Sequence, residues 1–154
     1  MTTQTGYSTS RVSEHQYFLG VARLLSFRST CRRRRAGCVL VDQHKHIIGT
    51  GYNGVPRNTP HCIDSPCSGA SAPSGQHLDA CEAVHAEINA LLQCSDVERV
   101  QTIYVTCSPC VQCIKALMNT GARLLVFAEL YPGWEELSKK WERSGRNWIL
   151  EDLK

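Results

Sequence analysis

Two short runs of the chain carry residues that could ligate a metal ion. His85 precedes Glu87 by two positions, and the run 109–113 (PCVQC) places Cys110 and Cys113 three positions apart. One imidazole nitrogen and two thiolates suit a catalytic zinc ion, which keeps its fourth position for water. We therefore interpret the two runs as one site, with His85, Cys110 and Cys113 as zinc ligands and Glu87 as the catalytic residue.

The chemistry expected of such a site is hydrolysis. Zinc lowers the pKa of its water to roughly 7. Glu87 would take a proton as hydroxide attacks an amidine-like carbon, and would return protons to a ring nitrogen and to departing ammonia. A lone C-x-x-C is more often a structural zinc knuckle or a redox pair, and a lone H-x-E carries little information. The two together, in this order, form the H-x-E…P-C-x-x-C signature of zinc nucleobase deaminases.

The periodicity of apolar residues predicts the elements that hold these runs. A helix over 13–27 is capped by Ser13, and a hairpin follows, with strands at 36–41 and 46–51 around a turn at 42–45. A helix over 78–93 carries His85 and Glu87 near its start. Further along, the sequence predicts strands at 101–106, 123–128 and 147–150, and helices at 111–119 (with Gly121 as its cap) and 134–143.

This order predicts an α/β fold of three layers, α/β/α, around a mixed five-stranded sheet. We expect residues 1–154 to form a single domain whose first dozen residues (1–12) are a loose tail. Hydrophobic residues make up 42% and charged residues 20% of the chain, as in ordinary globular proteins. No apolar stretch of membrane-spanning length and no signal peptide is visible, so we expect a cytoplasmic protein without a membrane partner.

Two local compositions stand out. Arg32 to Arg35 form an unbroken basic run in a chain of net charge +3. Such a run is a solvated face, a phosphate site for a small ligand, or a nucleic-acid contact.

The loop 57–76 is rich in Pro, Ser and Gly and shows no periodicity, and loops of this length are often functional. Nine cysteines in an unsecreted chain favour metal binding, at more than one site, over disulfides.

With these motifs in place, the chain resembles the bacterial and phage deoxycytidylate (dCMP) deaminases. The resemblance runs from Tyr17 to about Pro132 and rests on YFLGVARLLSFRSTC, GTGYNG, VHAEINALL and YVTCSPCVQC. It implies a cytidine deaminase-like fold and hydrolysis of dCMP to dUMP, which feeds thymidylate synthesis. It also implies a homohexamer that dCTP activates and dTTP inhibits, with Mg²⁺ accompanying the triphosphate. No nucleic-acid partner is expected.

The resemblance also implies roles for single residues. Asn53 would bind the deoxyribose 3′-hydroxyl, the backbone of Ala86 and Ser108 would read the cytosine edge, and Tyr131 would cover the substrate. The phosphate requires cations, and Arg28, Arg33 and Arg35 are the candidates, since the family has no run of four arginines to align. The residues implied for the effector site are Gly51, Tyr52 and Gly54.

Some members of the family carry a structural zinc that holds the long loop. Here Cys31, Cys62, His77 and Cys81 would make a closed tetrahedral site, and Cys67 could replace one of them. His77 and Cys81 would lie one helical turn apart. The alternative is a set of ordinary buried thiols. We assign Cys38, Cys94 and Cys107 to the core and His44, His46 and His61 to the surface.

Other functions remain open on the sequence alone. The nearest is deamination of free cytidine, which needs no phosphate-binding arginines, or of a tRNA base, which usually requires a more basic surface. A riboflavin-pathway deaminase is usually fused to a reductase domain. A zinc-knuckle nucleic-acid binder is the non-enzymatic alternative, and it assigns no role to Glu87.

Overall fold

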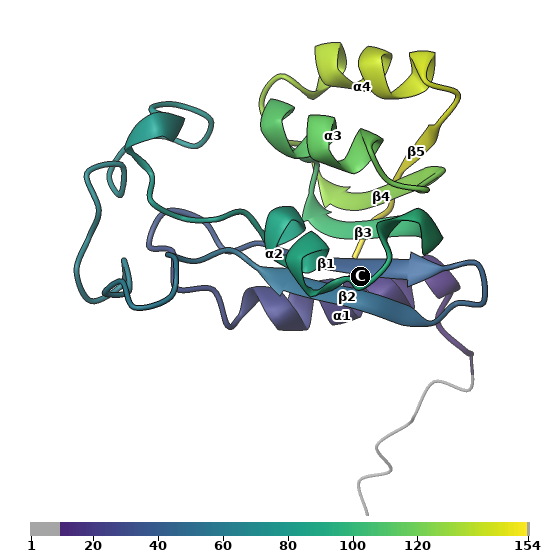
Figure 1. The fold of residues 1–154 in the computed structure, drawn as a ribbon, viewed down its shortest axis with the longest axis horizontal. Helices are drawn as coiled ribbons and strands as arrows, with labels where there is room; N and C mark the ends of the chain where they lie inside the picture. Colours follow the sequence, from purple (N-terminus) through teal and green to yellow (C-terminus); the bar gives the residue numbers. More distant parts are fainter. Residues whose placement is uncertain (1–9, 154) are drawn as a thin grey trace, which may run out of the picture.

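The computed structural model describes residues 10–153, which form a mixed five-stranded sheet (Figure 1). The strands are β1 (Gly37–Asp42), β2 (Ile47–Tyr52), β3 (Val100–Cys107), β4 (Leu124–Glu129) and β5 (Asn147–Leu150). Their order is β2-β1-β3-β4-β5, and β1 pairs antiparallel with both β2 and β3. The pairs β3–β4 and β4–β5 are parallel. The predicted tail, 1–12, falls mostly outside the described residues.

Helices cover both faces of this sheet, so the predicted three layers are confirmed. On one face α1 (Glu14–Ser26) packs Phe18, Leu19 and Ala22 against the sheet side chains Val39, Val41, Tyr104 and Val126. On the other face lie α2 (Ala86–Gln93), α3 (Val111–Met118) and α4 (Trp134–Arg143). Their core contains Ala90, Ile114, Leu117 and Trp141 together with β-strand residues such as Ile103 and Leu125.

Local side-chain chemistry fixes the start of α1 and the hairpin turn. The hydroxyl of Ser13 accepts from the backbone N–H of Gln16 at 3.1 Å, which confirms the predicted cap. In the β1–β2 turn, the Asp42 carboxylate accepts from the N–H groups of His44 and His46, each at 2.9 Å. Burial opposes ionisation of Asp42, but these two N–H donors and Arg99 outweigh it and lower the pKa of this carboxyl.

The predicted continuous helix over 78–93 is wrong. Residues Leu78–Ala80 form a single 3₁₀ turn, and α2 begins only at Ala86. Between them the backbone is extended, because Val84 exchanges two hydrogen bonds with Gly54, at 2.8 and 3.1 Å. We expected His77 and Cys81 to lie one turn apart on the same helix, and this is also wrong. His77 precedes the 3₁₀ turn with a left-handed backbone (φ 48°), and Cys81 follows the turn.

Gly121 is not the C-terminal cap of α3. The cap is Asn119, and the φ of Gly121 is not positive. A Cβ at position 121 would lie 2.0 Å from the carbonyl oxygen of Glu98. Glycine is needed there because two backbones meet, not because the chain turns into a left-handed conformation.

A second close approach sets the position of α2. A Cβ at Gly51 in β2 would lie 2.2 Å from the carbonyl oxygen of Ala86 and 2.4 Å from the backbone nitrogen of Ala90. A Cβ at Gly49 would lie 2.7 Å from the carbonyl oxygen of Ala90. These glycines therefore let the first turns of α2 lie directly on the β2 backbone.

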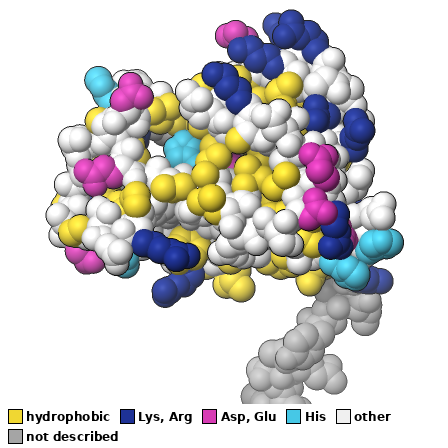
Figure 2. All heavy atoms as spheres, in the orientation of Figure 1, with side chains coloured by type: hydrophobic (Ala, Val, Ile, Leu, Met, Phe, Trp, Pro, Cys, Tyr) yellow, Lys and Arg dark blue, Asp and Glu magenta, His cyan; other side chains and the backbone are white. Residues whose placement is uncertain are grey.

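No helix within residues 10–153 is long and apolar enough to cross a bilayer. In Figure 2, basic side chains gather over the α3–α4 end, and apolar side chains are exposed near the middle of the same face. Figure 1 shows the long loop that precedes α2 extending away from the sheet, beside the segment between α1 and β1.

We predict that Gly51→Ala lowers the free energy of unfolding by about 1–3 kcal/mol, because the added methyl forces α2 away from β2. Urea unfolding followed by circular dichroism measures the effect. Gly20→Ala is the matched control, since a Cβ at Gly20 in α1 meets nothing within 4 Å. The control should be neutral or stabilising by up to about 1 kcal/mol. Equal stability of the two variants would contradict the close contact.

Candidate metal and catalytic site

The structure brings together the three side chains predicted to bind zinc. The ligand atoms of His85, Cys110 and Cys113 all lie within 4.8 Å of one another. His85 Nδ1 lies 3.4 Å from the Sγ atom of each cysteine. His85 is the N-cap of α2 and Cys110 is the N-cap of α3, so the positive ends of two helices meet at the site.

This donor set fits a zinc ion. Tetrahedral ligands at zinc–nitrogen and zinc–sulfur distances of about 2.0 and 2.3 Å lie roughly 3.6 Å apart, close to the spacing found here. A hydrogen bond from Cys113, and another with His85, lower the pKa of Cys110 to about 4. Cys110 therefore already favours the thiolate, which is the ligand form of cysteine, whereas the same contact and burial raise the pKa of Cys113.

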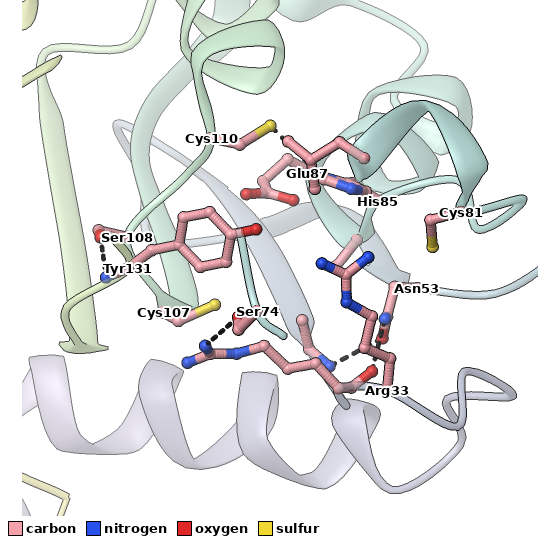
Figure 3. Close-up of a pocket in the computed structure, with 14 residues that line it drawn as sticks. Arg33, Asn53, Ser74, Cys81, His85, Glu87, Cys107, Ser108, Cys110 and Tyr131 are labelled. Carbon is pink, nitrogen blue, oxygen red and sulfur yellow. Dashed lines mark hydrogen bonds between the residues drawn. The ribbon is translucent and has the colours of Figure 1, made fainter. Parts of the chain in front are cut away.

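Glu87 lies beside the three ligands and is 4% exposed. Its carboxylate faces the pocket next to His85 and Cys110 in Figure 3. Burial raises the pKa of Glu87 above its ordinary value, while its own backbone N–H and His85 oppose that shift. The raised pKa makes the carboxylate a stronger base, which favours its taking up and returning a proton in general acid–base catalysis.

The pocket above this cluster is narrow, with a volume of about 60 Å³. It lies at the carboxyl ends of β2 and β3, between α2, the long loop and the segment after β4. The volume is smaller than the roughly 300–1,000 Å³ of typical ligand sites. Side chains from five segments line it, namely Arg33, Arg34, Asn53, Ser74, Leu78, Cys81, Cys107, Ser108 and Tyr131, with the catalytic cluster at its base.

Asn53 lines the pocket, but its side-chain amide also binds the backbone of residues 32–36, called here the arginine segment. Asn53 Oδ1 accepts from the N–H of Ala36 at 2.8 Å, and Nδ2 donates to the carbonyl of Arg34 at 2.7 Å. Its own carbonyl accepts from the Ser29 hydroxyl at 2.9 Å. One Nδ2 hydrogen remains for a ligand. Sequence reasoning found Asn53 but not this positioning of the arginines.

The four arginines have different environments. The guanidinium of Arg33 points into the pocket below His85 in Figure 3. Its Nη2 donates to the carbonyls of Pro73 and Gln76 in the long loop. Its Nη1 is buried and has no hydrogen-bond partner among the described residues. A buried donor without a partner is rare and points to an absent ligand. Arg28 and Arg32 are exposed and line none of the cavities described here.

Arg34 was missed among the site residues, since nothing in a run of four arginines distinguishes one member. It lines the pocket and pairs with Glu129 at 2.9 Å. Its other amino group donates to the Ser74 hydroxyl at 3.1 Å, and its guanidinium lies 5.4 Å from the centre of the Tyr131 ring. Arg35, which was predicted to meet the substrate, lines a neighbouring cavity instead.

The remaining residues expected at the substrate line the pocket together. The Tyr131 N–H donates to the buried Ser108 hydroxyl at 2.6 Å, which fixes the ring at the pocket wall (Figure 3). The N–H of Ser108 is already bound to the Glu129 carbonyl at 2.8 Å, so its backbone offers a ligand only the carbonyl. Ala86 is fully buried in the first turn of α2, where helix N–H groups lack intrahelical partners.

The residues expected at an effector lie in a separate cavity. Gly51, Tyr52 and Gly54 line a space of about 730 Å³ together with Asn58, His61 and residues of α2. Asn53, between Tyr52 and Gly54, lines the catalytic pocket instead. One short strand end therefore contributes to both cavities.

The residues expected to bind a second zinc ion do not bring their ligand atoms close enough together to share one ion. Among the described residues, no three of Cys31, Cys62, Cys67, His77 and Cys81 bring their ligand atoms within 4.8 Å of one another. The sulfur atoms of Cys62 and Cys67 lie 3.7 Å apart. Burial raises the pKa of Cys81, and the charges of Cys31 and Cys67 add to the shift. Cys67 therefore lies beside Cys62, one of the four predicted ligands.

The chain is similar in sequence to curated proteins from a phage, a yeast and a bacterium. The chain is 37% identical over 124 residues to the deoxycytidylate deaminase of Mycobacterium phage D29, covering 77% of this chain and 96% of that protein. It is 35% identical over 137 residues to the deoxycytidylate deaminase of Saccharomyces cerevisiae, covering 88% of this chain but only 44% of the yeast protein. ComE operon protein 2 of Bacillus subtilis is 37% identical over 140 residues, with 88% and 69% covered.

Solved structures share the fold. The dCMP deaminase of cyanophage S-TIM5, in complex with dCMP and dUMP, aligns with a TM-score of 0.67 at 21% identity, covering 88% of this chain and 95% of that one. Residues 12–129, which include both ligand runs, match the family described as the cytidine and deoxycytidylate deaminase zinc-binding region. Because that match spans most of the chain and encloses His85, Glu87, Cys110 and Cys113, the protein belongs to this family of zinc-binding deaminases.

Proposed function

We propose that this protein hydrolyses dCMP to dUMP and ammonia. The observation that carries the proposal is the buried Nη1 of Arg33, which has no hydrogen-bond partner within residues 10–153. Arg33 lines the same narrow pocket as His85, Glu87 and Cys110. A deaminase that acts on a nucleoside needs no cation at this place. A phosphate oxygen on the substrate would satisfy this donor with a charge-assisted hydrogen bond.

His85, Cys110 and Cys113 would hold the zinc ion. When bound, zinc lowers the pKa of a coordinated water to roughly 7, which supplies hydroxide at neutral pH. Glu87 Oε would take one proton from that water and deliver it to the ring nitrogen of cytosine as the water oxygen bonds to the amino-bearing carbon. Glu87 would then take the second proton, from the new hydroxyl group, and deliver it to the amino group, which leaves as ammonia while the carbon becomes a carbonyl. The free N–H of Ala86 and the carbonyl of Ser108 would hold the edge of the base, and Tyr131 would cover it.

The cavity of about 730 Å³ beside β2 would receive the regulatory nucleotides. Its size suits a nucleoside triphosphate, and Gly51, Tyr52 and Gly54 are the residues for which the resemblance implied this role. In this proposal dCTP with Mg²⁺ activates and dTTP inhibits a homohexamer. Asn53 lies between Tyr52 and Gly54 and binds the backbone of Arg34 and Ala36. A nucleotide that moved the end of β2 would therefore also move the arginine segment.

We predict that Glu87→Ala lowers ammonia release from dCMP by at least roughly 100-fold, because the proton carrier is lost. Zinc content per chain, measured by atomic emission, should not change, since Glu87 is not a ligand. Full activity of the variant would exclude the proposed chemistry and favour a binding module. The same measurement counts the metal ions. Two zinc ions per chain are expected if the cysteines of the long loop hold a structural ion, and one would exclude it.

We predict that Arg33→Ala lowers kcat/KM for dCMP by roughly 10- to 100-fold, as expected for loss of one charge-assisted hydrogen bond. Turnover of deoxycytidine should change much less, because it carries no phosphate. This comparison separates phosphate binding from the contacts of Arg33 with Pro73 and Gln76, whose loss would impair both substrates.

Arg32→Ala is the matched control for this variant, since it removes the same charge from the same run but lines no cavity described here. Arg32→Ala should leave both substrates unaffected. If wild-type protein deaminated deoxycytidine as well as dCMP, the assignment of a nucleotide substrate would be wrong.

We predict that dCTP with Mg²⁺ raises, and dTTP lowers, turnover at dCMP concentrations below KM. Differential affinity of the two effectors for two states of the enzyme would produce these opposite responses. Steady-state rates across both effector concentrations, with and without Mg²⁺, measure them. Rates independent of both nucleotides would show that the cavity beside β2 is not a regulatory site in this protein.

A further inference from the structure

A second cavity, of about 350 Å³, lies next to the catalytic pocket on the α1 side of the sheet. It is within the size range of small-ligand sites, whereas the catalytic pocket is below it. Its polar lining comes from α1, from the arginine segment, from the ends of β3 and β4, and from the residues after β5, namely Arg23, Arg34, Arg35, Thr106, Glu129 and Asp152.

Three arginines, Arg23, Arg34 and Arg35, and two carboxylates, Glu129 and Asp152, line this cavity. Glu129 is paired with Arg34 at 2.9 Å. Arg23 and Arg35 have no side-chain hydrogen bond or ion pair within residues 10–153. Thr106 Oγ1 accepts from the N–H of Gly37 at 3.2 Å, so its hydroxyl hydrogen remains available to donate. Two unpaired guanidinium groups and a hydroxyl donor therefore face one space.

Arg34 connects this cavity to the catalytic pocket, because it lines both. On the catalytic side its guanidinium donates to Ser74 and lies against the Tyr131 ring. On the other side it pairs with Glu129, whose side chain is 71% exposed. An exposed ion pair of this kind is weak and open to competition from another anion.

We propose that this second cavity binds a phosphate group, as inorganic phosphate or on a small phosphate ester, through Arg23, Arg35 and Arg34. The bound dianion competes with Glu129 for Arg34 and thereby shifts the contacts of Arg34 with Ser74 and Tyr131. The site is separate from the substrate phosphate site at Arg33 and does not depend on dCMP being the substrate.

Calorimetric titration of the zinc-loaded protein with inorganic pyrophosphate tests the proposal, with dUMP at saturation to fill the catalytic pocket. Binding should persist under dUMP, and Arg23→Ala/Arg35→Ala should weaken it at least roughly tenfold. The matched control is Arg28→Ala/Arg32→Ala, which removes the same charge from the same segments but from outside both cavities. Orthophosphate and a phosphate monoester such as glycerol phosphate form parallel arms that identify the preferred source.

Three outcomes would overturn the site: no binding of pyrophosphate, orthophosphate or the monoester, loss of binding under saturating dUMP, or equal weakening in the two double variants. The last would indicate only diffuse attraction by net charge.

Circular dichroism confirms folding of each variant, and Arg23→Lys/Arg35→Lys should retain part of the affinity. Glu129→Gln should strengthen binding because it removes the competing carboxylate, and weaker binding would exclude the competition for Arg34. If the protein bound no dUMP but Arg23→Ala/Arg35→Ala still weakened pyrophosphate binding, the second site would stand and the proposed substrate would be wrong.

Discussion

The contact between the β2 backbone and the first turn of α2 determines where the catalytic groups lie. The Ala86 carbonyl occupies the space that a side chain at Gly51 would fill. That approach sets the depth at which α2 begins, and His85 and Glu87 are the N-cap and the second residue of this helix. The start of α3 comes to the same place from the end of β3 and brings Cys110 and Cys113. The metal site is thus the meeting of two helix N-termini at one edge of the sheet.

The arginine segment is positioned by backbone contacts rather than by its own side chains. Asn53 binds the carbonyl of Arg34 and the N–H of Ala36, and so ties the segment to the end of β2. Consecutive side chains of the segment then point to different places. Arg33 faces the catalytic pocket, Arg34 lies between the two cavities, and Arg35 faces only the second. A run that looks uniform in sequence therefore places three of its cations in different surroundings.

Residue type and spacing were enough to predict the ligand cluster, the buried carboxylate and the mixed sheet, because each depends on a local pattern. The errors have long-range causes. The helix expected over 78–93 starts late because Val84 pairs with Gly54, thirty positions earlier. Gly121 looks like a helix cap, but the Glu98 backbone requires its lack of a side chain. Nothing in the sequence separates Arg34 from its neighbours, since its role follows from Glu129, Ser74 and Tyr131, which reach it only in the fold.

Acidic and basic side chains line different parts of the catalytic pocket, and their separation would help to select the substrate. Cys110, whose pKa is lowered, and Glu87 line the pocket beside His85, and the guanidinium of Arg33 lies on the wall that the long loop covers. One guanidinium therefore serves two purposes, since Nη2 holds Pro73 and Gln76 while Nη1 faces the pocket. A phosphate bound at Nη1 would also affect the loop that closes a pocket of only about 60 Å³. Binding energy at the phosphate would thus help to order the groups around the base, and its absence from a nucleoside would reduce kcat as well as affinity.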